Sequence, residues 1–243
     1  MTKTQKEKDN VLNNAVLPGA AAAWPIFLGY IPLGLAFGVI AWNAGLEPWQ
    51  IGLMSVMLFA GSAQFIAISM LAAGANMASI IITTFAVNLR HVLMSSSLSL
   101  HLNETSRKRL ALFAYGVTDE TFAVNLINFR KGGWNFSRAL TLNHVSNFSW
   151  VASTIVGGYA GEFIPEGAFG IDYALVAMFI GLLAMQMKSR KYVLTALFAG
   201  ALAVIFSLTL PGNLYIIAAS MLSATGGMLV LRKIRQVKSS ERA

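Results

Sequence analysis

The sequence predicts an all-α polytopic membrane protein with six to eight transmembrane segments, some of them broken or re-entrant. Three observations predict this class: 56% of the 243 residues are hydrophobic, only 12% are charged, and the mean hydropathy is +0.63. Soluble domains carry roughly a quarter of their residues as charged side chains. A transmembrane helix needs about 20 apolar residues, so this length accommodates six to eight of them.

Eight apolar segments follow one another, and their connectors are too short for a separate soluble domain. We expect each segment to be helical, because a backbone that crosses a bilayer must satisfy its hydrogen bonds within itself. The expected organisation is a polar cytoplasmic tail at 1–14, a transmembrane transport domain at 15–231 and a basic cytoplasmic tail at 232–243. The segments lie at about 15–42, 50–73, 78–100, 110–128, 139–160, 172–187, 192–211 and 213–231.

Three segments contain residues that interrupt a helix. The first contains prolines and the stretch Gly29–Gly34, which predicts a broken helix. The second contains Gly61–Gln64 and the fourth contains Thr118–Glu120, both inside apolar runs. Irregular backbone inside a membrane is tolerated only where it is buried in protein or lines a cavity. The fifth segment is rich in Ser, Asn and Thr, and the last three are more uniformly apolar.

The net charge of +8 comes from Lys and Arg that flank the apolar segments. Of the 18 such residues, 17 lie in five flanks, and cytoplasmic flanks are the ones that carry this excess. If all eight segments span, 14 lie inside and the three at Arg107–Arg109 lie outside. If segments two and four each enter and leave on one side, all 17 lie inside. Both arrangements place both termini in the cytoplasm, and discontinuous clusters of this kind fit a lipid bilayer better than nucleic acid.

The eighteenth positive residue, Arg90, lies twelve residues into an apolar segment. An Arg near the bilayer centre costs at least about 2.5–3.5 kcal/mol, so it should face a partner or a wet cavity. The counter-charges in the apolar region are Asp119 and Glu120. Arg90 therefore either forms an ion pair that orients helices or holds a substrate carboxylate in bidentate geometry.

Asp119 and Glu120 are adjacent, so on one helix they point about 100° apart and cannot both pair with Arg90. One is expected to serve Arg90, and the other to take a substrate ammonium group or a proton. The alternative is that both are solvated near the membrane surface. In the second segment, Ser62 and Gln64 either bond a substrate's polar atoms or serve close helix packing.

The remaining polar residues exclude several classes of chemistry. His91 and His144 suit proton relay or, more simply, hydrogen-bonded packing, and the three histidines lack the i,i+4 spacing of a metal site. The absence of cysteine excludes disulfides and thiolate chemistry. No phosphate-binding glycine loop is present, so we expect no cofactor and no ATP-driven cycle. A membrane enzyme built on Asp119, Glu120 and His91 would lack a nucleophile elbow, so a transporter is favoured.

Two apolar segments share a weak internal sequence repeat, since residues 88–92 resemble residues 141–145. Each stretch follows an interrupted segment. If segments two and four enter from opposite sides, the pairs two–three and four–five would form an inverted repeat, which is common in transporters. Gly34 with Gly38 and Gly157 with Gly161 have GxxxG spacing, which predicts close helix packing.

The polar signatures together resemble the AzlC family over about residues 15–230. The matching stretches are Pro32–Gly34 with Phe37-Gly38, Phe59–Phe65, Asn88–His91, Thr118–Ala123 and Gly170–Ala174. The resemblance implies the large subunit of a bacterial branched-chain amino acid exporter. Such proteins work with a small AzlD-like membrane subunit and export leucine, isoleucine and valine, often methionine, and analogues such as azaleucine.

The resemblance and the charges together give the expected function, an inner-membrane secondary transporter that is proton-coupled. Arg90 is expected to hold the substrate carboxylate, and Asp119 or Glu120 to hold the ammonium group or couple protons. Asn88 and His91 belong to the same signature as Arg90, and Ser62 and Gln64 complete the expected substrate-binding or coupling residues. The alternative is a passive channel, or a scaffold subunit whose small partner carries the pathway.

Overall fold

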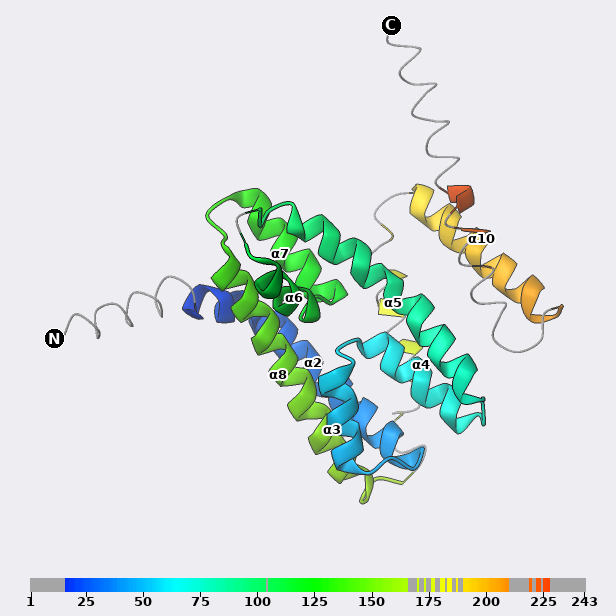
Figure 1. Ribbon diagram of the computed structural model, residues 1–243. Coiled ribbons are helices and arrows are strands. Elements are labelled where there is room, and N and C mark those ends of the chain that lie inside the picture. Colours follow the sequence, from blue (N-terminus) through cyan, green and yellow to red (C-terminus); the bar gives the residue numbers. More distant parts are fainter. Residues whose placement is uncertain are drawn as a thin grey trace, which may run out of the picture. The chain divides into compact units, whose positions relative to one another are not determined.

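The computed structural model describes residues 16–103, 105–165 and 190–209, with isolated positions between 170 and 187 and between 219 and 227. Within these residues all regular structure is helical (Figure 1), which confirms the predicted all-α class. The expected tails at 1–14 and 232–243, and most of the sixth and eighth segments, lie outside the described residues.

Eight helices have defined bounds, and the chain divides into two compact units. One unit comprises residues 1–76 and 87–176, and the other comprises residues 77–86 and 177–243. Among the described residues, α2 and α5 are long and apolar enough to cross a membrane. The helices are α2 (Leu17–Asn43), α3 (Pro48–Met57), α4 (Gly61–Ala72), α5 (Met77–Ser99), α6 (Arg107–Tyr115), α7 (Asp119–Lys131), α8 (Phe136–Gly161) and α10 (Arg190–Ser207).

The first apolar segment is one continuous helix, so the expected break at Gly29–Gly34 is wrong. Pro25 and Pro32 both lie inside α2. An interior proline removes a backbone hydrogen bond and costs about 3 kcal/mol. The packing of α2 against α8 offsets this local penalty, because it extends from Gly19 near the start of α2 to Trp42 at its end.

Glycines bring α2 and α8 into close parallel contact, which confirms the predicted packing role of both GxxxG pairs. A Cβ added at Gly38 would lie 2.3 Å from the carbonyl oxygen of Thr154, and one at Gly157 would lie 2.3 Å from that of Leu35. A Cβ on Gly161 would meet Trp42 at 2.7 Å. Residue numbers rise together along both helices, so α2 and α8 run in the same direction (Figure 1).

The second and fourth apolar segments are broken where the sequence predicts. The second consists of α3 and α4, separated by residues 58–60, and the fourth consists of α6 and α7, separated by residues 116–118. Gly116 follows the end of α6. Thr118 is the N-cap of α7 and forms a capping box: its hydroxyl accepts from the amide of Thr121, and the Thr121 hydroxyl accepts from the amide of Thr118.

Helices α6 and α7 form a hairpin along the first half of α8. The Arg109 guanidinium lies 4.3 Å from the ring centre of Phe136, and a Cβ on Gly116 would lie 2.6 Å from that of Asn143. Helix α6 therefore runs parallel to α8. Helix α7 leads back to the start of α8, because only residues 132–135 separate the two.

Helices α3 and α4 approach α8 from its other end. Pro48 lies beside Gly158, and a Cβ on Gly61 would lie 3.1 Å from Trp150, so α3 runs antiparallel to α8. Helix α4 turns back along α3. One turn into α4, the Phe65 ring packs on Phe37 with ring centres 5.1 Å apart, nearer to Pro48 than the start of α4 is. The two hairpins thus point towards each other along α8.

The tips of the two hairpins meet near the middle of α8. The rings of Phe59 and Tyr115 lie 6.3 Å apart, and the Tyr115 hydroxyl donates to the carbonyl oxygen of Val56. This meeting point is where the candidate functional side chains converge.

Candidate functional site

Arg90 on α5 connects the tips of both hairpins. Its Nη1 lies 2.9 Å from Oδ2 of Asp119, and its Nη2 donates to the hydroxyl of Ser62. Asp119 is the first residue of α7 and Ser62 the second of α4. The ion pair confirms the prediction that one of the two acidic residues neutralises Arg90. The two side chains are 32% and 27% exposed, so the pair is accessible from outside the protein interior.

The two adjacent carboxylates point to different helices, as their spacing requires. Asp119 pairs with Arg90 on α5, whereas Oε2 of Glu120 accepts a hydrogen bond of 2.8 Å from the Tyr30 hydroxyl on α2. Both acids lie in the first turn of α7, where the helix dipole favours negative charge. The first turn of α7 is therefore held between α2 and α5.

Tyr30 was not among the expected site residues. Its side chain is 6% exposed, and its hydroxyl also lies 2.8 Å from the Thr118 hydroxyl. Its ring packs edge-on against Trp150 and Phe59. The sequence signal for this residue is a hydroxyl in the middle of an apolar segment, beside glycine and proline residues that also predict a helix break.

His91 binds the backbone at the α6–α7 break, in the packing role that the sequence favoured. Its Nδ1 lies 2.7 Å from the carbonyl oxygen of Val117. Because a carbonyl only accepts, Nδ1 carries the hydrogen. Within the described chain, His91 Nε2, Asn88 Oδ1 and Arg90 Nε are buried without a hydrogen-bond partner. These three residues belong to one signature and lie on one turn of α5.

Gln64 lies in a hydrogen-bond network separate from that of Arg90. Its Nε2 donates to Ser55 over 3.0 Å, its Oε1 accepts from Trp150 Nε1 over 2.8 Å, and its side chain is fully buried. The Ser55 hydroxyl is also bonded to Thr154. Gln64 therefore joins α3, α4 and α8, while Ser62 faces the candidate site.

A second buried network, absent from the expected site, holds the α6–α7 hairpin on α8. Asn143 Nδ2 donates to the carbonyl oxygen of Phe113 at 3.0 Å, and its Oδ1 accepts from Asn125 at 2.9 Å. The Trp134 indole donates to Asn125 at 2.9 Å. Both asparagines are fully buried, so each amide bonds within the protein.

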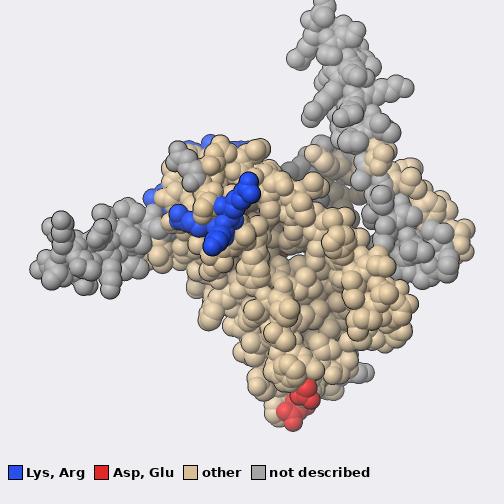
Figure 2. Space-filling model, viewed as in Figure 1, with Lys and Arg blue, Asp and Glu red and all other residues tan. Residues whose placement is uncertain are grey.

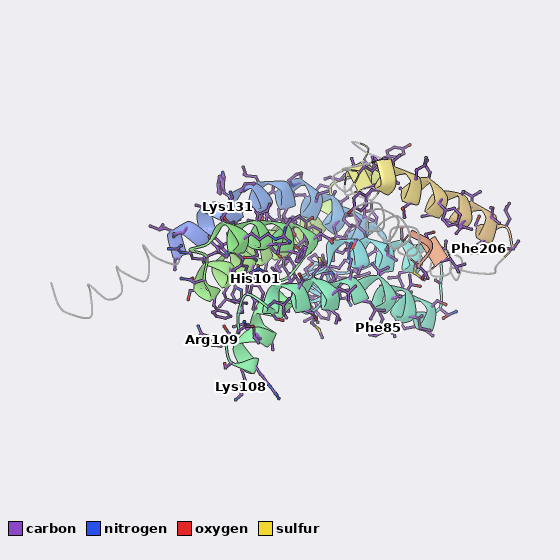
Figure 3. The ribbon with its side chains drawn as sticks, turned by 90° about the horizontal axis from the view of Figure 1, so that it is seen from above. Phe85, His101, Lys108, Arg109, Lys131 and Phe206 are labelled. Atoms are coloured by element: carbon purple, nitrogen blue, oxygen red, sulfur yellow. The ribbon has the colours of Figure 1, made fainter. Side chains whose placement is uncertain are left out.

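The other two histidines lie away from Arg90. His101 stacks on Phe129 near the basic end of the molecule (Figure 3), and His144 is exposed on α8. Among the residues that the structure describes, no three His, Asp or Glu side chains come together as metal ligands.

Exposed basic residues gather where the α6–α7 hairpin begins and ends. Arg107, Lys108 and Arg109 begin α6, and Arg130 and Lys131 end α7. Figure 2 shows blue side chains at this end of the face in view, an acidic patch at the far end and uncharged surface between them. Helices α6 and α7 form a hairpin, so the start of α6 and the end of α7 lie close together. The basic residues at these two ends therefore form one group.

Comparison with known proteins adds independent evidence. The AzlC protein family model matches residues 25–164, a stretch that contains all the contacts of Arg90 described above. The branched-chain amino acid transport protein AzlC of Bacillus subtilis (strain 168) is 34% identical over 214 residues, covering 86% of this chain and 82% of that protein.

Two further relatives have names that place them in membranes. The inner membrane protein YgaZ of Escherichia coli (strain K12) is 31% identical, with 80% of this chain and 83% of that protein covered. An uncharacterized membrane protein of Helicobacter pylori (strain J99) is 29% identical, with 86% and 91% covered. No solved structure matches the chain.

Proposed function

The chain belongs to the AzlC family, and on that premise we propose that it is the large subunit of a bacterial inner-membrane exporter of branched-chain amino acids. The proposed substrates are leucine, isoleucine and valine, with methionine as a further one, and the proposed partner is a small AzlD-like subunit. The transport name of the Bacillus relative supports a transporter rather than an enzyme. The observation that carries the proposal is the position of Arg90 between the two hairpin tips.

Arg90 and the start of α4 would hold the substrate carboxylate. A guanidinium binds a carboxylate through two parallel hydrogen bonds. The N-terminus of α4 has no side-chain cap, and Ser62 in its first turn already contacts Arg90. Unpaired backbone amides and the helix dipole at such an end favour an anion. Broken helices in transporters use their ends in this way.

The acidic first turn of α7 would take the other end of the amino acid. Asp119 or Glu120 holds the ammonium group or couples transport to protons. The Tyr30 ring packs on Phe59 and Trp150, so a buried apolar cluster borders Glu120 on the side where we place the branched side chain. Charged ends and an apolar side chain are what a branched-chain amino acid presents.

The efflux of labelled leucine, isoleucine, valine and methionine from proteoliposomes tests this function. We expect efflux of the branched-chain substrates from vesicles that contain both subunits. A panel in which none of the four moves refutes the proposal. Equal flux from the small subunit alone would favour the scaffold alternative. Flux that runs only down the amino acid's own concentration gradient, with or without an imposed ion gradient, would favour a passive channel.

For the topology, we propose six full spans and two re-entrant hairpins that enter from opposite sides. Segments two and four are the hairpins, and both termini are cytoplasmic. The contact of Arg109 with Phe136 supports this arrangement, because it joins the residues on either side of segment four. All 17 flanking Lys and Arg then lie on the cytoplasmic side.

The absence of cysteine makes this topology directly testable by labelling. Lys108→Cys and Lys131→Cys should both react with a membrane-impermeant maleimide in inside-out vesicles. Trp49→Cys, at the exposed start of α3 on the opposite side, should react in right-side-out vesicles. Labelling of the Cys at 108 from the periplasmic side would contradict the re-entrant arrangement.

A further inference from the structure

We propose that Tyr30 positions Glu120 as the proton-carrying carboxylate of the transport cycle, while Asp119 remains the counter-charge of Arg90. This inference rests on the proposed transport function and assigns separate roles to two neighbouring carboxylates. The structure separates them by their partners, since Asp119 binds a guanidinium on α5 and Glu120 binds a hydroxyl on α2.

Among the residues that the structure describes, Glu120 has no positive partner of its own. Arg90 on α5 is paired with Asp119 at 2.9 Å. His91, also on α5, donates its Nδ1 hydrogen to the backbone at Val117. Helices α2 and α4 contain no charged residue, and α8 contains only Arg138 at its start and the exposed His144. The hydrogen-bond partner of Glu120 on the neighbouring helices is the uncharged Tyr30 hydroxyl.

The hydroxyl groups around Glu120 can serve both of its protonation states. When Glu120 is ionised, the Thr118 hydroxyl donates to Tyr30 and the Tyr30 hydroxyl donates to Glu120. When Glu120 is protonated, its own hydroxyl donates to Tyr30, and the Tyr30 hydrogen turns to Thr118. The Thr118 hydrogen then turns to Thr121, 3.4 Å away, which itself donates to the carbonyl oxygen of Gly116 at 2.9 Å.

No hydrogen bond of the chain is lost in this exchange. One proton is added to the carboxylate, and the hydroxyl hydrogens rotate without leaving their oxygens. A buried polar group that loses its partner costs about 1–3 kcal/mol. Because the hydrogen bonds between Thr118, Tyr30 and Glu120 can reverse their direction, this penalty is avoided in each transport cycle. Asp119 has no comparable hydroxyl chain among the described residues, and its protonation would leave the positive charge of Arg90 without a counter-charge.

Tyr30 is also placed to transmit the change. Its side chain is 6% exposed and packs on Trp150 of α8 and Phe59 at the α3–α4 break. Without the Tyr30 hydroxyl, the Glu120 carboxylate would lose its hydrogen bond to α2.

The test measures the ratio of protons to leucine moved by the full chain, reconstituted with its small partner. Labelled leucine and a pH-sensitive dye inside the vesicles report the two fluxes. We expect the ratio to fall by about tenfold or more in Glu120→Gln and in Tyr30→Phe, because each removes a bond to a charged group. Tyr115→Phe is the matched control: it removes a hydroxyl at the same hairpin tip that bonds backbone, and it should keep the ratio.

The outcomes separate this inference from the function on which it rests. If the wild-type protein moves no leucine, the proposed function fails. If it moves leucine without protons, or if Glu120→Gln keeps the wild-type ratio, only the present inference is overturned. If Glu120→Gln moves no leucine, Tyr30→Phe decides, since it retains the carboxylate. A Tyr30→Phe protein whose two fluxes fall by the same factor would have a structural defect, which also refutes the assigned role.

Discussion

Replacing Arg90 by alanine should abolish leucine transport while the protein still folds and inserts. The substitution removes the ion pair with Asp119 and the hydrogen bond to Ser62. Breaking a fully buried pair costs about 3–5 kcal/mol, whereas an exposed pair is worth about 0–1 kcal/mol. The side chains are 32% and 27% exposed, so the free energy of unfolding should fall by an intermediate amount, about 2 kcal/mol.

The effect on transport should be much larger than the effect on stability. A substrate carboxylate bound in bidentate geometry makes two charge-assisted hydrogen bonds, each worth about 1.5–3 kcal/mol. Loss of both weakens binding by about 3–6 kcal/mol, which is a hundredfold or more. Arg90→Lys keeps the charge but not the fork geometry, so it should retain more activity than Arg90→Ala. Counterflow of labelled leucine in proteoliposomes measures all three proteins.

A double variant separates the structural role of Arg90 from its transport role. Arg90→Ala leaves the Asp119 carboxylate unpaired, and the further change Asp119→Ala removes that charge. We expect the double variant to regain thermal stability but not counterflow. Normal leucine counterflow in Arg90→Ala would refute the assigned role, and so would restored counterflow in the double variant.

Two further substitutions test the packing that holds the site. Gly157→Ala should prevent folding, because its Cβ would lie 2.3 Å from the backbone of Leu35, whereas Gly29→Ala, with nothing within 4 Å, should fold normally; yield and size-exclusion profile measure both. Asn143→Ala removes one hydrogen bond from Asn125 Nδ2 and one from the Phe113 carbonyl. At about 1–3 kcal/mol for each lost partner, the thermal midpoint in detergent should fall by about 5–10 °C, and an unchanged midpoint would contradict the anchoring role.

The helix breaks were predictable because their signals are local. Glycine, serine and charged residues inside an apolar run mark the ends of half-helices, and both Gly61–Gln64 and Thr118–Glu120 lie where a helix begins. The break in the first segment was wrong because its cause is not local. The packing of α2 on α8 outweighs the cost of the two interior prolines, and the residues that supply this packing lie more than a hundred positions away.

The site was predictable where electrostatics leaves few choices. A single intramembrane Arg and two acidic residues have few ways to pair, so the partner of Arg90 could be narrowed to Asp119 or Glu120. Tyr30 could not be found in this way, because a hydroxyl has many possible partners and its own lie 88 and 90 positions away. Ser62 and Gln64 diverge because residues two apart on a helix do not face each other.

The parallel contact of α2 with α8 also constrains how the protein is made. Ser153 on α8 bonds to the Tyr30 carbonyl on α2, a separation of 123 residues. At roughly 5–20 residues per second, the ribosome needs about 6–25 s to supply the second helix after the first. During that interval the glycine face of α2 has no partner, and neither hairpin has the α8 surface on which to close. Insertion therefore has to precede assembly, and a chain that stalls before Phe136 leaves α2 and α3 without their main packing partner.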